Sequence, residues 1–118
     1  GYAQAIATGH HALKSDEPAS LGGTDSGPAP YQLLLAALGS CTSITLRMYA
    51  QRKGWELGTV RVALAMTRDD AGAESVLREI SVSAPIDDDQ RARLLEIAGR
   101  TPVTKTLLKG LAIDSRFV

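Results

Sequence analysis

The chain has only one cysteine among its 118 residues, and this scarcity excludes an intramolecular disulfide. Nothing in its cysteine usage therefore points to an oxidising compartment. No signal peptide is visible at the start of the sequence, so we expect a cytoplasmic protein.

Aromatic residues and net charge are also scarce. The aromatic fraction is 4%, which is too low for a platform on which bases could stack. Thirteen basic residues balance thirteen acidic ones, and no basic stripe occurs. Nucleic acid and membrane surfaces are therefore poor candidates for partners. The apolar run from Tyr31 to Leu46 is also expected to be too short for a membrane span.

Several motifs that bind cofactors or metals are missing. There is no Gly-rich loop followed by Lys and Ser or Thr, no dinucleotide-binding spacing, and no set of Cys and His with zinc spacing. His10 and His11 are adjacent on an expected strand, so their side chains should point to opposite faces and cannot share a metal. We expect neither a cofactor nor a metal site.

The pattern that is present predicts a single α+β domain over residues 1–118. Two strands at 2–7 and 11–15 turn at Gly9, and a loop rich in Gly, Pro, Ser and Asp follows. A long helix should run from about Pro30 to Lys53 and stop at Gly54. Its basic residues Arg47, Arg52 and Lys53 suit the negative end of the helix dipole.

The second half of the chain predicts a hairpin, two helices and a last strand. Residues 60–66 and 76–84 alternate with period two around the turn "DDAGAE", although Arg78 breaks the pattern. Asp87 and Gln90 form a capping box for a helix that ends at Gly99. A short helix follows from Thr101 to about Lys109, and "LAIDSRF" (111–117) should be a strand.

The long helix predicts a second copy of the chain. Six consecutive apolar residues, 33–38, cover the whole circumference of a helix, which must then be buried on all sides. The remaining short elements can cover only one face. A homodimer in which two such helices pack together is the economical solution, and close helix approach would explain Gly39.

Cys41 lies on this helix, and the residues around it favour a structural role for this cysteine. Its helical neighbours, including Ala37, Leu38, Ile44 and Met48, form an apolar face, and apolar surroundings leave a thiol inert. Arg47 lies off that face. From local pattern alone Cys41 is interpreted as a core cysteine.

Two longer stretches change this interpretation. "SDEPASLGGTDSGPAPYQLLLAALGSCTSITLRMYAQRKGW" (15–55) and "DDDQRARLLEIAGRTPVTKTL" (87–107) strongly resemble the OsmC/Ohr family, the osmotically inducible and organic hydroperoxide resistance proteins of bacteria. The resemblance implies an intertwined α+β homodimer with long central helices flanked by antiparallel or mixed sheets. It also implies a role in oxidative stress defence.

The resemblance gives Cys41 a chemical role. Peroxidases of the family attack a hydroperoxide with a cysteine on the long helix, form a sulfenic acid, and resolve it with a second cysteine in a Cys-Pro motif. Cys41 matches the attacking position. The resolving position falls on Thr101, and a His often found three residues later falls on Thr104.

The charged groups of the family's site are replaced as well. A Glu ten residues before the attacking cysteine is Tyr31 here. The arginine that this Glu orients comes from the N-terminal strands or loops, and no arginine precedes Arg47. Only His10, His11 and Lys14 offer positive charge there, and His11 is the histidine expected at the pocket.

Two functions therefore stay open at this point. The first is a one-cysteine peroxidase, whose sulfenic Cys41 is reduced by an external thiol. The second is a non-catalytic dimer that binds a small apolar ligand in a pocket formed by Tyr31, Cys41, Thr101 and Thr104.

Overall fold

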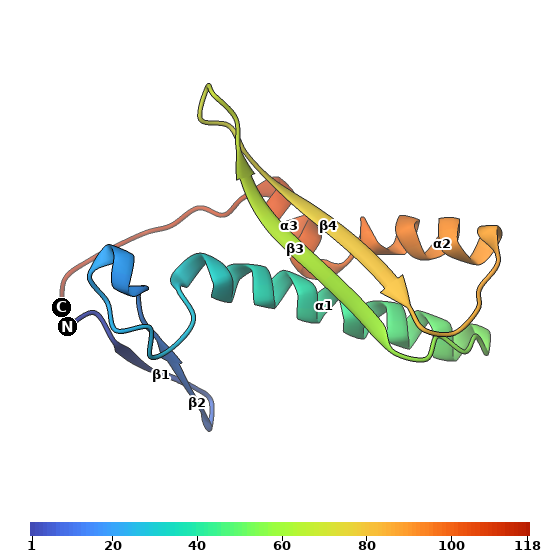
Figure 1. The fold of residues 1–118 in the computed structure, drawn as a ribbon, viewed down its shortest axis with the longest axis horizontal. Helices are drawn as coiled ribbons and strands as arrows, with labels where there is room; N and C mark the ends of the chain where they lie inside the picture. The colour runs from blue at the N-terminus through green and yellow to red at the C-terminus, as the bar shows by residue number, and fades with distance from the viewer. The chain divides into compact units, whose positions relative to one another are not determined.

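The computed structural model describes all 118 residues and has the expected α+β architecture, with one long helix and two antiparallel strand pairs (Figure 1). The elements are β1 (Gln4–Thr8), β2 (His11–Ser15), a 3₁₀ turn (Ala19–Leu21), α1 (Pro30–Lys53), β3 (Val60–Arg68), β4 (Glu74–Val82), α2 (Asp88–Ala98) and α3 (Pro102–Lys109). The chain forms two compact units, Gly1–Ala36 and Ala37–Val118, and each is described by itself. The single-domain organisation stays a prediction.

The N-terminal unit is a hairpin followed by an ordered loop. Strands β1 and β2 pair antiparallel with Thr8 opposite His11, and Gly9 turns the chain with a positive φ of 59°. The first strand had been predicted to begin at Tyr2, but it begins at Gln4. The hairpin and its turn are otherwise confirmed.

A buried carboxylate organises the loop. Asp16 is 2% exposed and accepts hydrogen bonds from the backbone N–H and the hydroxyl of both Thr24 and Ser26. These bonds, led by the Thr24 hydroxyl, hold the pKa of Asp16 far below its usual value. Gly23 passes so close to the carbonyl of Glu17 that a Cβ atom there would collide with it. The loop is therefore a fixed structure built around one side chain.

The second unit is formed around the β3–β4 hairpin. The two strands pair antiparallel over their whole length, from Val60 opposite Val82 to Arg68 opposite Glu74. Figure 1 shows the second half of α1 and helix α2 beside this hairpin. The predicted helix bounds are confirmed, including the capping box of Asp87 and Gln90 and the end of α2 at Gly99.

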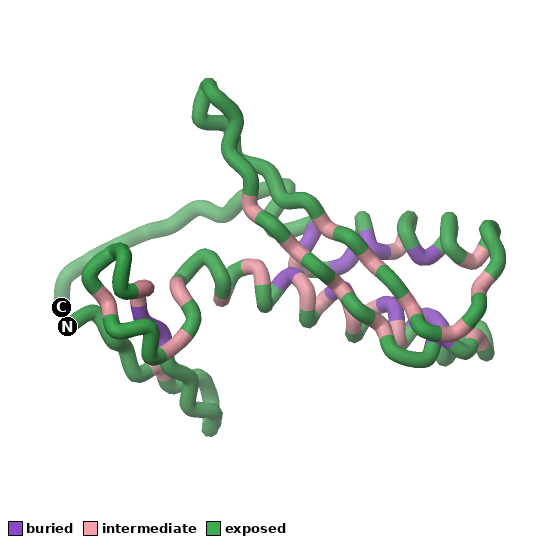
Figure 2. The backbone as a smooth tube through the Cα atoms, in the orientation of Figure 1, coloured by how far each residue is buried: buried purple, intermediate pink, exposed green.

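The core lies where these elements meet. Buried residues Leu46, Tyr49 and Ala50 of α1 pack with Leu94 and Ala98 of α2, and Figure 2 shows the buried positions on the two helices. Leu46 is fully buried, and truncating such a leucine to alanine costs about 2–5 kcal/mol.

Gly39 was predicted to allow close approach of a second helix, but within the protomer it lies against strand β3. A Cβ atom at this position would lie 2.8 Å from Cδ1 of Leu64, so the glycine lets strand β3 approach α1 closely. Close approach of a second helix is not needed to explain it.

The C-terminal strand is the one element absent from the structure. Residues 111–117 form no strand, and Leu111, Ile113 and Phe117 are exposed. Their alternation favours a strand, but a strand forms only where a neighbouring edge completes its hydrogen bonds. No strand pairs with this segment in the protomer.

The prediction that the apolar run is too short for a membrane was wrong on length. By length and composition alone, α1 could cross a bilayer. The core helix of a globular protein meets the same criterion, and Leu46 and Tyr49 of α1 belong to the core cluster. The exclusion of a membrane partner stays a prediction.

Candidate functional site

Cys41 is a free, half-buried thiol in the middle of α1. The core-facing residues of this part of the helix are Leu38, Thr42 and Leu46, and Cys41 lies beside them without belonging to the core cluster. On the exposed side, Ile44 and Met48 are 56% and 57% accessible. Cys41 is therefore not part of the protomer's own core, because the protomer covers only one face of the helix.

The residue next to Cys41 is held by an arginine. Nη1 of Arg78, on β4, donates to the hydroxyl of Thr42 at 3.0 Å and to that of Thr104 at 2.9 Å. Nη2 donates to the carbonyl of Ala98 at 2.8 Å. One guanidinium therefore joins α1, the end of α2 and α3.

The hydroxyls around this guanidinium form a consistent network. Thr42 donates to the carbonyl of Leu38 at 2.7 Å, which leaves its lone pairs to accept from Arg78. Thr104 lies 2.6 Å from the hydroxyl of Thr101 and can donate to Ala98. Thr101 and Thr104 are both buried. The structure thus brings these two predicted site residues together and connects them through Arg78 to Thr42.

The other two predicted site residues belong to the N-terminal unit. Tyr31 is exposed in the first turn of α1, and His11 is exposed at the start of β2. Their place in a pocket with Cys41 stays a prediction. The expectation that His10 and His11 point to opposite faces was wrong, because their ring centroids lie 4.1 Å apart. His10 lies in the turn, where strand alternation does not apply. No group of three or more His, Cys, Asp or Glu side chains could hold a metal.

A groove of about 580 Å³ opens beside Arg78, and we call it the Arg78 groove. Its apolar lining is formed by Leu38, Val76, Leu95, Leu107 and Leu108. Its polar lining is formed by Arg78, Thr104, Ser75 and Glu74. The volume and the mainly apolar walls are typical of a small-molecule site.

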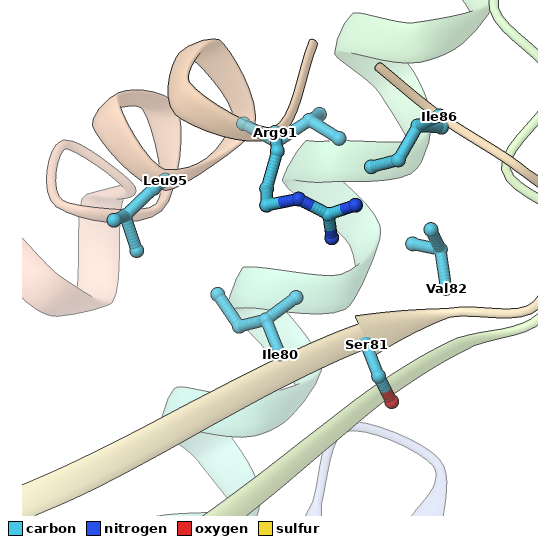
Figure 3. Close-up of a pocket in the computed structure, with 7 residues that line it drawn as sticks. Ile80, Ser81, Val82, Ile86, Arg91 and Leu95 are labelled. Carbon is cyan, nitrogen blue, oxygen red and sulfur yellow. The ribbon is translucent and has the colours of Figure 1, made fainter. Parts of the chain in front are cut away.

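A smaller cavity of about 230 Å³ lies between β4 and α2 (Figure 3). Ile80 and Val82 of β4 face Leu95 and the guanidinium of Arg91 from α2, while Ser81 points away. None of the residues predicted from the sequence as site residues lines this cavity.

Comparison with known proteins decides the family. The profile of the OsmC-like protein family matches residues 23–116, which is most of the chain. The chain belongs to the OsmC-like protein family. The resemblance seen in the sequence is thereby confirmed.

Solved structures agree with this assignment. A Psychrobacter arcticus protein, named for an expected osmotic-stress and detoxification response, matches with a TM-score of 0.73 and 18% identity, covering 90% of this chain and 87% of that one. An organic hydroperoxide resistance protein of Legionella pneumophila matches with a TM-score of 0.65, 18% identity and 89% and 86% coverage. A Lactobacillus casei protein named for an expected redox role is 30% identical, with a TM-score of 0.58 and 92% and 83% coverage. No curated protein matches.

Arg78 is the residue of this OsmC-like site that the sequence analysis missed. It had been noted only as a break in the alternation of β4. In the structure it lies on the same side of the strand as Ile80 and Val82, and its long side chain reaches polar partners between the helices. A charged residue at an inward position of a strand was the available signal, because such a charge requires partners.

Proposed function

We propose that this OsmC-like protein reduces organic hydroperoxides with the thiol of Cys41. The observation that carries the proposal is a free, half-exposed thiol on α1. The resemblance to the family implies that this is the attacking cysteine. The family includes organic hydroperoxide resistance proteins, such as those of Legionella pneumophila and Bacillus subtilis.

The reaction needs one cysteine and an external thiol. The Cys41 thiolate attacks the terminal oxygen of the hydroperoxide, the O–O bond breaks, and the alkoxide takes a proton to leave as an alcohol. The sulfur becomes a sulfenic acid. An external thiol then attacks the sulfenic acid, releases water and forms a mixed disulfide with Cys41. A second external thiol attacks the mixed disulfide, which frees the Cys41 thiol and joins the two external thiols in a disulfide. Because the chain has no second cysteine, no intramolecular disulfide can form.

Arg78 is the candidate for the cation that the family takes from its N-terminal segment. Its hydrogen bond to Thr42 fixes the helical turn that carries Cys41. No hydrogen bond joins Arg78 to Cys41, so its part is to position this turn and to supply positive potential near it. Such potential favours the anions that form during the attack.

A homodimer is part of the proposal. Ile44 and Met48 leave an apolar face of α1 uncovered, and Ile113 and Phe117 leave another apolar set in the C-terminal segment. Both features support a second copy of the chain, which could bury this face of α1 and pair with the C-terminal segment. The intertwined arrangement known from the family would satisfy both at once.

The test is to trap the sulfenic acid. After one equivalent of cumene hydroperoxide, a dione trap should label Cys41, and mass spectrometry should find the label on the peptide containing it. Cys41→Ser should remain unlabelled. If the folded protein is unlabelled while a two-cysteine relative reacts, the alternative of a non-catalytic ligand-binding dimer is favoured. The Arg78 groove is the observation that supports that alternative.

A further inference from the structure

Arg78 is a half-buried cation that lacks an anionic partner. Its three hydrogen-bond acceptors, on Thr42, Thr104 and Ala98, are all neutral. No carboxylate forms an ion pair with it. Burial lowers the pKa of the guanidinium, but an arginine stays protonated in proteins. The positive charge is therefore permanent and is not neutralised by a carboxylate.

The guanidinium also has donors to spare. An arginine has five N–H donors, and three of them are used here. The two that remain, on Nε and Nη2, have no protein acceptor. Because no side-chain nitrogen without a partner is buried, Nε is in accessible space. Arg78 also lines the groove. Arginine donors of this kind are well suited to a carboxylate.

The charge of Arg78 lies in a groove whose lining is mainly apolar. Leu107 and Leu108 of α3 and Val76 of β4 provide an apolar wall, and Leu108 is 80% exposed. The one acidic residue of the lining, Glu74, is paired with Arg68 at 2.7 Å. Its carboxylate is therefore engaged elsewhere and does not neutralise Arg78.

We propose that the Arg78 groove binds an aliphatic carboxylate, with the head group on Arg78 and the hydrocarbon chain against Leu107 and Leu108. Charge complementarity selects an anion, and the leucines select an apolar chain. The proposal does not rest on peroxidase activity, because Cys41 does not line the groove.

The first experiment compares ligands of one chain length. Octanoate, 1-octanol and octyltrimethylammonium are titrated into the intact protein at neutral pH and low salt by calorimetry. Octanoate should bind about tenfold more tightly than octanol, because a hydrogen bond to a charged group contributes that much, and the cation should bind most weakly. Added salt should reduce the preference for octanoate. Equal affinity of octanoate and octanol would overturn the proposal.

The second experiment compares two exposed leucines. Leu108→Glu places a carboxylate in the groove and should weaken octanoate binding about tenfold. Leu111→Glu makes the same change at a residue that is 74% exposed and outside the groove lining, and should leave affinity unchanged. Cys41→Ser should also bind normally, which separates this site from the thiol chemistry. If octanoate does not bind, or if both leucine variants behave alike, the groove is not a carboxylate site.

Discussion

The guanidinium of Arg78 on β4 donates to the hydroxyl of Thr42, the residue next to Cys41 on α1, over 3.0 Å. The same nitrogen donates to Thr104, and the adjacent one to the carbonyl of Ala98. A strand residue thus fixes the helical turn of the candidate nucleophile together with two further helices. The proposed chemistry and the stability of the second unit both depend on this residue.

Replacing Arg78 should lower stability by about 3 kcal/mol, because Arg78→Met removes three hydrogen bonds from a charged donor, to Thr42, Thr104 and Ala98. The measurement is urea unfolding followed by circular dichroism. Arg61→Met is the matched control, since Arg61 is exposed on the neighbouring strand β3, and it should change stability by less than about 0.5 kcal/mol. Equal effects of the two substitutions would contradict the structural role of Arg78.

The position of Thr101 predicts an engineered disulfide. Thr101 is buried against Thr104, which Arg78 connects to the turn of Cys41. We expect Thr101→Cys to form a disulfide with Cys41 after one equivalent of hydroperoxide, because the resemblance implies that Thr101 occupies the position of the family's resolving cysteine. Mass spectrometry should show that both thiols are lost. If the sulfenic acid forms and both cysteines stay unlinked, the two Cα atoms are too far apart for a bond, beyond about 7 Å.

The uncovered face of α1 predicts a homodimer in solution. Light scattering at micromolar concentration should give about twice the chain mass of 12.5 kDa. Replacing Ile44 and Met48 by Glu should shift the protein toward the monomer, because charges would be buried in the interface. Ala71→Glu and Ala73→Glu, at exposed positions in the turn between β3 and β4, serve as the charge control. A folded wild-type monomer would exclude this arrangement.

Asp16 predicts an acid-sensitive loop. Because hydrogen bonds from Thr24 and Ser26 lower its pKa in the folded state below the usual 3.8, its ionised form stabilises the fold above that value. This contribution is lost as the pH falls through the lower folded pKa. The stability difference between wild type and Asp16→Asn should therefore be constant near neutral pH and shrink below about pH 4. A difference between wild type and Asp16→Asn that stays constant down to about pH 2 would contradict this role of the Asp16 carboxylate.

Local signals in the sequence were sufficient for most of the fold. The bounds of α1 followed from Pro30 and Gly54, and the start of α2 followed from its capping box, because these signals act within a few residues. The strand expected at 111–117 is absent, because a strand depends on a partner edge that the local pattern does not encode.

The candidate site was predictable only in part, for a related reason. Cys41, Thr101 and Thr104 were predicted from their positions in the stretches that resemble the family, and their role in a site stays a prediction. Arg78 lies outside the two stretches that carry the resemblance, and its partners on α1 and α3 are 36 and 26 residues away in sequence. Periodicity assigns a residue to a face of a strand, but it does not say which distant group a long side chain will reach.

The most direct test of the central claim is the rate at which Cys41 reacts with cumene hydroperoxide in the folded and in the urea-unfolded chain. The unfolded chain presents the same thiol without its surroundings, so the ratio of the two second-order rate constants measures what the fold contributes. If the fold provides a peroxidase site, the folded protein should react at least about a hundredfold faster, as expected for electrostatic activation of a nucleophile. A folded protein that reacts no faster than the unfolded chain would contradict the claim that Cys41 is a catalytic thiol.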